Sequence, residues 1–171
     1  YGNLLPDEVI KSNQEFALYY SWILITTGQV VEAEKYLDYP QKVIDAATNG
    51  EGSAKEPILA DKFLFGKLAV TLAYMKLFTA SPETIIKYSE IALDNLAETN
   101  PLWTGWAWYF IGNAELVKGE VHKGLDAFNC ALEFSKNTDN IYLIATITST
   151  IVSRRCGLGQ YKYAYALCTD I

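Results

Sequence analysis

The sequence predicts an all-α protein built from about four antiparallel helix hairpins. Apolar residues recur at helical spacing, and the alternation that marks β-strands is almost absent. Turns are expected at Gly28, Ala80, Gly119 and Gly159, so the last three turns are almost evenly spaced and the first interval is longer. A regular period of about 40 residues with two helices in each period is typical of a helical solenoid.

The third hairpin has the clearest pattern. In the segment from Val121 to Ser135, the residues Val121, Leu125, Phe128, Leu132 and Ser135 are spaced four, three, four and three apart. This spacing places them on one face of an amphipathic helix. The segment from Trp103 to Lys118 has the same periodicity, and Gly119 separates the two. A helix that ends at glycine, with another starting directly afterwards, indicates an antiparallel hairpin.

The remaining hairpins follow the same plan. In the first, a helix from Gln14 to Thr27 is followed by a return helix from Val30 to Asp38. In the second, a helix from Pro57 to Thr79 is followed by a return helix that ends at Leu96, with Ser81 as its N-cap and Pro82 as its first residue. In the last, a helix from Ile141 to Cys156 is followed by a return helix from Tyr161 to Cys168. The polar loop from Asn49 to Pro57 accounts for the long first interval. We therefore predict one helical-repeat domain over 1–171, with units at about 14–48, 57–98, 103–137 and 139–170.

The third unit resembles a tetratricopeptide repeat. The resemblance rests on Trp108, Ile111-Gly112, Leu116, Gly119-Glu120, Gly124, Phe128 and Ala131-Leu132. Small residues at 112, 124 and 131 would let the paired helices approach closely, and Phe128 would fill the gap between them. The other units keep the register, although the second is degenerate. The resemblance implies a right-handed superhelical stack whose first helices line a concave groove.

A narrower resemblance concerns the segment LYYSWILITTGQVVEAE from Leu18 to Glu34, followed later by WAWYFIGNA from Trp106 to Ala114. These segments resemble the repeat region of MalT-type transcription regulators of the LuxR superfamily, which are bacterial. The resemblance implies a central sensor segment between an ATP-binding module and a C-terminal helix-turn-helix. Because the chain begins at Tyr1 without Met and stops at Ile171 directly after a helical pattern, we expect it to be a fragment of a longer protein.

The composition limits which binding partners and which cellular compartment we expect for this chain. The net charge is −6, and the only adjacent arginines are Arg154 and Arg155, so we expect no direct contact with nucleic acid. These arginines could instead pair with acidic residues of the stack. No apolar run reaches the length of a membrane span, so we expect no membrane association. The three cysteines are odd in number and form no C-x-x-C pair, which favours a reducing, cytoplasmic compartment.

The sequence lacks the residue sets that catalysis needs. His122 is the only histidine, and it stands in a polar context at the start of a return helix, where a solvated side chain is expected. There is no phosphate-binding G-x-x-x-x-G-K-[ST] motif. Carboxylates such as Glu32 and Glu34 diverge around a helix rather than facing one another. We predict no enzyme, no metal and no cofactor.

The predicted binding surface is the concave groove. The register implied by the resemblance places eight candidate residues there, namely Trp22, Lys67, Tyr74, Trp106, Tyr109, Asn113, Ser149 and Ser153. Aromatic rings with neutral polar groups suit a sugar-like or peptide ligand. The alternative is that Trp22 and Trp106 merely pack against neighbouring units.

Two functions fit this surface. The first is a ligand-sensing regulatory segment of a MalT-type regulator, in which a small-molecule effector in the groove biases self-association or release of the parent protein. The second is a tetratricopeptide scaffold that binds a peptide or partner protein in the same groove. An enzyme is the least favoured class, because no catalytic set is present.

Overall fold

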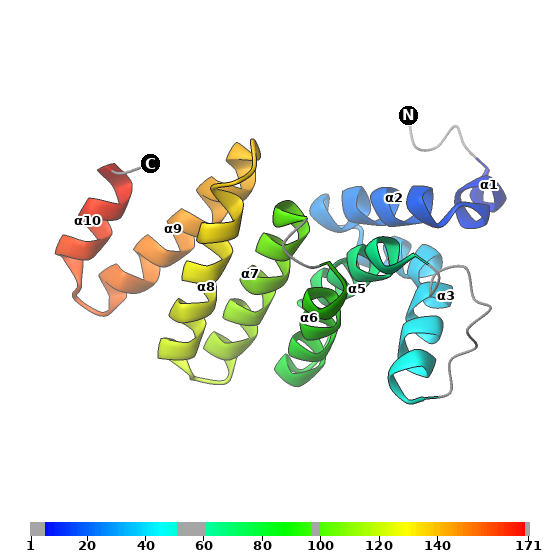
Figure 1. Ribbon diagram of the computed structural model, residues 1–171, viewed down its shortest axis with the longest axis horizontal. Helices are drawn as coiled ribbons and strands as arrows, with labels where there is room; N and C mark the ends of the chain where they lie inside the picture. Colours follow the sequence, from blue (N-terminus) through cyan, green and yellow to red (C-terminus); the bar gives the residue numbers. More distant parts are fainter. Residues whose placement is uncertain (1–5, 51–60, 97–99, 170–171) are drawn as a thin grey trace. The chain divides into compact units, whose positions relative to one another are not determined.

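The computed structural model describes residues 6–50, 61–96 and 100–169, and every regular element in these ranges is a helix (Figure 1). The prediction of an all-α protein is therefore confirmed. The helices are α1 Asp7–Ser12, α2 Gln14–Thr26, α3 Val30–Thr48, α5 Lys62–Lys76, α6 Pro82–Leu96, α7 Pro101–Val117, α8 Val121–Ser135, α9 Ile141–Gly157 and α10 Tyr161–Thr169. They form two compact units, residues 1–96 and 97–171, which are described separately below.

Polar caps and glycines set the ends of the helices. The side chain of Asn13 accepts hydrogen bonds from the first-turn amides of α2, Asp61 does so for α5, and Asn140 for α9. Each cap satisfies donors that a helix start leaves unpaired. The glycines at three turns, Gly28, Gly119 and Gly159, have positive φ angles of 79°, 85° and 72°, a conformation that glycine adopts without a steric penalty. The glycine turns predicted at these positions are confirmed.

In the second unit, α7 and α8 lie antiparallel at very short range. A Cβ atom added to Gly112 would lie 2.5 Å from the ring of Phe128, and one added to Gly124 would lie 2.9 Å from Leu116 and 3.0 Å from the carbonyl oxygen of Gly112. Phe128 is fully buried. The two glycines thus admit the close approach, and the ring fills the space between the helices, as the sequence predicted.

Helix α9 joins this pair through another glycine. A Cβ atom at Gly105 of α7 would lie 3.2 Å from Leu143 of α9 and 3.4 Å from the carbonyl oxygen of Ala131 in α8. Leu143 is fully buried. Gly105 therefore seats a side chain of the following hairpin, and α10 packs in turn on α9.

In the first unit, α5 packs against α6 and also against α2 and α3. A Cβ atom at Gly66 of α5 would lie 2.7 Å from Leu96 of α6. The second unit has the matching contact, since a Cβ atom at Gly105 would lie 3.8 Å from Ser135. The offset in sequence from Gly66 to Gly105 equals the offset from Leu96 to Ser135, and α6 and α8 have the same length at that offset. The α5–α6 and α7–α8 pairs therefore share a close contact at matching positions.

Two buried tyrosines link the helix pairs of the first unit. The hydroxyl of Tyr36 in α3 donates to Asp7 of α1 at 2.9 Å, and the hydroxyl of Tyr88 in α6 donates to both carboxylate oxygens of Asp45 in α3 at 3.0 Å. Lys87 pairs with the same Asp45 at 3.2 Å. Burial, with the hydrogen bond to Asp7, raises the pKa of Tyr36 to about 12. Burial and the hydrogen bond to Asp45 raise the pKa of Tyr88 above its usual range.

Some elements differ from the predictions. The return helix expected from Val30 to Asp38 continues through Pro40 to Thr48. A proline within a helix usually ends it, but here Pro40, Val43 and Ile44 are all buried, and their burial stabilises the continuation. The short helix α1 was not predicted. The predicted loop from residue 51 onwards and the start of the second hairpin at Pro57 lie outside the described residues.

We predict that Gly112→Ala lowers the free energy of unfolding by about 1–3 kcal/mol, because the new methyl group overpacks the buried Phe128 ring. Urea titration followed by circular dichroism measures the change. The matched control is Gly157→Ala near the end of α9, where a Cβ atom would meet nothing within 4 Å. An equal loss of stability in both variants would contradict the proposed close contact.

We also predict that the protein loses stability as the pH rises from about 10 to about 12. An unfolded tyrosine ionises near pH 10, whereas folded Tyr36 keeps its proton up to about pH 12. The stabilising effect is therefore fully present below the unfolded pKa and is lost as the pH rises through this window. Urea titrations at a series of pH values should show a shallower decline for Tyr36→Phe, and an identical decline would contradict the assignment.

Candidate functional site

Two of the predicted groove residues come together in the first unit. The rings of Trp22 in α2 and Tyr74 in α5 have their centroids 5.0 Å apart, and the ring centroid of Phe78, two residues beyond the end of α5, lies 5.9 Å from that of Tyr74. Lys67 lies seven residues before Tyr74, which places both on one side of α5. We call Trp22, Lys67, Tyr74 and Phe78 the aromatic face.

The aromatic face is open to solvent to a different degree at each residue. Trp22, Lys67 and Tyr74 are half-buried, whereas Phe78 is 59% exposed. The buried residues Leu18 and Ile25 stand four residues before and three residues after Trp22 in α2, so Trp22 lies at the edge of the buried side of this helix. The arrangement is a row of partly exposed rings, with a lysine two turns away along α5.

Of the predicted groove residues of α7, Trp106 lies in the core, whereas Tyr109 and Asn113 are half-buried. Trp106 is 8% exposed. Its ring stacks on that of Phe110, with the centroids 5.8 Å apart, and packs against that of Tyr142 in α9, with the centroids 6.2 Å apart. Tyr109 is half-buried against Phe128 at 5.6 Å. The amide nitrogen of Asn113 donates to the carbonyl oxygen of Tyr109 at 2.8 Å. For Trp106 the structure thus shows the packing role that the sequence left as the alternative.

The two serines of α9 are exposed, and the hydroxyl of Ser149 donates to the carbonyl oxygen of Thr146 at 3.0 Å. Among the eight candidates, the structure places Trp22 against Tyr74 in the first unit, and both Trp106 and Asn113 against Tyr109 in the second. A continuous groove over all four hairpins stays a prediction.

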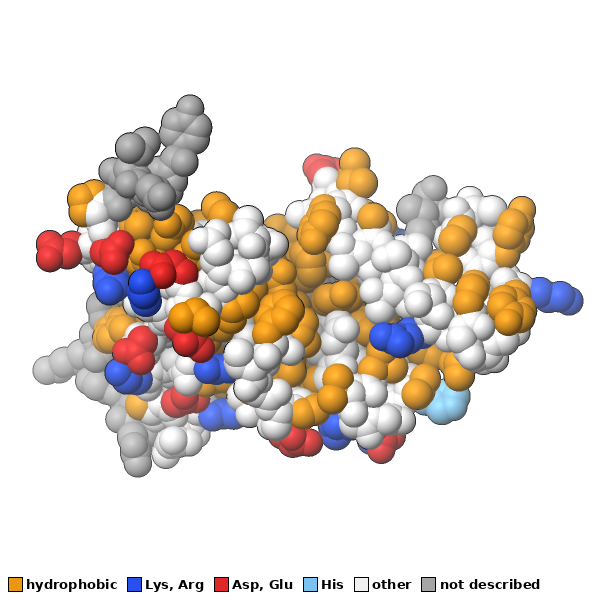
Figure 2. All heavy atoms as spheres, turned by 180° about the vertical axis from the view of Figure 1, so that it is seen from behind, with side chains coloured by type: hydrophobic (Ala, Val, Ile, Leu, Met, Phe, Trp, Pro, Cys, Tyr) orange, Lys and Arg blue, Asp and Glu red, His pale blue; other side chains and the backbone are white. Residues whose placement is uncertain are grey.

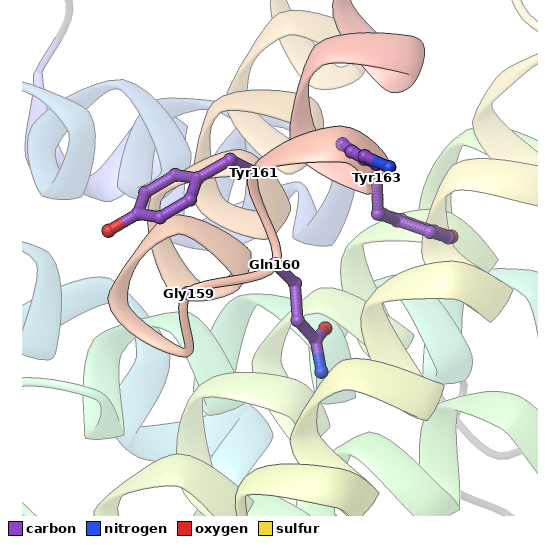
Figure 3. Close-up of a pocket in the computed structure, with 5 residues that line it drawn as sticks. Gly159, Gln160, Tyr161 and Tyr163 are labelled. Atoms are coloured by element: carbon purple, nitrogen blue, oxygen red, sulfur yellow. The ribbon is translucent and has the colours of Figure 1, made fainter.

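A further surface feature lies at the turn between α9 and α10. A depression of about 520 Å³ is lined by Gly159, Gln160, Tyr161, Lys162 and Tyr163. Figure 3 shows the Tyr161 and Tyr163 side chains on opposite sides of this turn, with Gln160 between them. Arg155 donates to the Gln160 side chain at 2.7 Å and lies 4.4 Å from the Tyr163 ring centroid. The sequence suggested that Arg155 pairs with an acidic residue. In the structure it contacts the side-chain amide of Gln160 and the ring of Tyr163 instead.

Hydrophobic side chains reach the surface at many places. Figure 2 shows them in orange between white polar side chains and backbone on one face of the molecule. Large hydrophobic residues with more than half of their surface exposed include Phe16, Ile23, Phe78, Val117, Ile141, Tyr142, Tyr161 and Tyr165. Phe78 and Tyr142 were not identified from the sequence, because their periodicity alone does not separate a core residue from a surface one.

The chemistry available in the described part of the chain is limited. His122 is exposed. Across residues 6–50, 61–96 and 100–169, no three His, Cys, Asp or Glu side chains are grouped so that they could hold a metal ion. Burial raises the pKa of the Cys130 thiol, which keeps it protonated and weakly nucleophilic at neutral pH. No described helix has both the length and the apolar character required to cross a bilayer.

Comparison with protein-family models, with curated proteins and with solved structures gives no match.

We predict that Trp106→Ala lowers the free energy of unfolding by about 3–5 kcal/mol, because it removes a buried ring. Trp22→Ala should lower it by roughly 1–2 kcal/mol, as expected for a half-buried side chain. Urea titrations of both variants test the order. A larger loss for Trp22→Ala would show that the aromatic face is core rather than surface.

Proposed function

We propose that this chain is a non-enzymatic binding module whose aromatic face holds a segment of a partner protein. The supporting observation is the row formed by Trp22, Tyr74 and Phe78, with ring centroids 5.0 and 5.9 Å apart, on two helices that are otherwise well packed. Partly exposed aromatic rings on a rigid support are the residues that dominate the affinity of protein interfaces.

The openness of this face favours a peptide over a small molecule. Small-molecule sites usually enclose most of the ligand surface, whereas Phe78 is 59% exposed and Tyr74 only half-buried. An extended or helical segment can cover such a row with several side chains. Lys67 on the same side of α5 would pair with an acidic residue of that segment, so we propose a partner with aliphatic or aromatic anchors and a nearby carboxylate.

The helix pairs support a repeat architecture of the tetratricopeptide type. The glycine turns, the constant sequence offset between the α5–α6 and α7–α8 pairs and the small residues at their crossings agree with that family. We propose that the pairs are such repeats. Their stacking into one right-handed superhelix stays a prediction of the sequence.

A second candidate is effector sensing in a MalT-type regulator. The resemblance of the segments from Leu18 to Glu34 and from Trp106 to Ala114 supports it, and so does the pair of Trp22 and Tyr74, since aromatic rings also stack on sugar rings. In that case the ligand would shift the parent protein between two states of association.

Selection from a phage-displayed library of random linear peptides tests the first function. We expect the selected peptides to carry apolar anchors and an acidic residue. We expect Phe78→Ala to lower their binding affinity about tenfold, which corresponds to ~1.4 kcal/mol of binding free energy. Trp22→Ala should weaken them further. The control is Val117→Ala, which changes an exposed apolar residue of the other unit.

A parallel thermal-shift screen of sugars and small metabolites tests the second function. A saturable rise in melting temperature that Trp22→Ala abolishes, with no peptide selected, would favour effector sensing over peptide binding. Peptides that bind equally well to the wild type and to Phe78→Ala would contradict the assigned face.

A further inference from the structure

Among the described residues, helix α10 exposes two large aromatic side chains on one side. In α10, Ala164 is the buried residue, whereas Tyr161 is 66% and Tyr165 is 74% exposed. The two tyrosines are four residues apart, so they lie on the same side of the helix, and Lys162 lies beside them. We call Tyr161, Lys162 and Tyr165 the basic face.

The charged residues of the two helices at the basic face are all basic. Helices α9 and α10 carry Arg154, Arg155 and Lys162 and no acidic residue. Arg155 is engaged with Gln160 and Tyr163, while Arg154 and Lys162 are exposed. A partner for this surface must therefore be acidic as well as apolar.

A surface of that kind lies at the start of the same chain. Phe16, Tyr19 and Ile23 of α2 are about half exposed and recur at positions i, i+3 and i+7, which makes one apolar stripe. Glu15 borders the stripe. Helices α1 and α2 together carry Asp7, Glu8 and Glu15 against a single Lys11. We call Glu15, Phe16, Tyr19 and Ile23 the acidic face.

We propose that the basic face of one copy binds the acidic face of a second copy. Both surfaces are rows of exposed aromatic or aliphatic side chains, and their charges are opposite. Pairing either face with the same face of another copy would bring like charges together, which disfavours that pairing. Contacts between the two different faces can close into a reciprocal dimer or a ring, or can continue as an open assembly. This inference does not depend on the proposed peptide binding.

Sedimentation velocity and light scattering over a range of protein concentrations measure the association. We expect the weight-average mass to rise with concentration above the monomer value. Tyr165→Ala should weaken the association at least tenfold, because it removes an exposed ring without touching the core. Circular dichroism confirms that each variant is folded.

Charge reversals test the pairing of the two faces. Lys162→Glu and Glu15→Lys should each reduce self-association when studied alone. An equimolar mixture of the two variants should associate again, because the acidic side chain at position 162 of one copy then faces the basic side chain at position 15 of the other. The matched controls Lys123→Glu in α8 and Glu90→Lys in α6 also change exposed residues, and each should behave as the wild type.

Two results would overturn the proposal. The first is a monomer at all concentrations. The second is association that Lys162→Glu and Glu15→Lys leave unchanged, which would place the contact elsewhere on the molecule.

Discussion

The close approach of paired helices is the constraint on which the rest of this structure depends. Gly112 faces the ring of Phe128 at a distance that no larger residue could accept without displacement. The equivalent positions of the α5–α6 pair, at the constant offset that relates the two pairs, are Ala73 and Ser89, both fully buried. One pair combines the smallest residue with a large ring, and the other combines two small residues. Solvent is excluded from both positions, although the division of side-chain volume differs.

This packing explains where the side chains with binding potential stand. Gly105 seats Leu143 of the following helix, and buried Tyr36 and Tyr88 join the helix pairs of the first unit through Asp7 and Asp45. Within the first unit, α2 packs against α3 and α5, and α5 also packs against α3 and α6. These two helices carry Trp22 and Tyr74. The aromatic face is therefore a set of rings held by an ordered core. Such pre-organisation lowers the entropy lost when a partner binds.

The sequence predicted the helices and turns well because their signals are local. Glycine at positive φ and apolar residues at helical spacing act within a few residues. The continuation of α3 through Pro40 was missed, because it depends on tertiary burial of Val43 and Ile44. The site was predicted only in part for the same reason. Periodicity placed Trp22 and Tyr74 on first helices, but it could not show that Trp106 packs against Tyr142 or that Phe78 joins the aromatic face.

A double-mutant cycle of Gly112→Ala with Phe128→Leu tests the central packing constraint most directly. If a methyl group introduced at position 112 collides with the Phe128 ring, shortening that side chain should relieve the collision. The stability loss of the double variant should then be smaller than the sum of the single losses by about 1 kcal/mol or more. Urea titrations of the four proteins provide the cycle. Additive losses would show that Gly112 and Phe128 do not constrain one another, and would contradict the account.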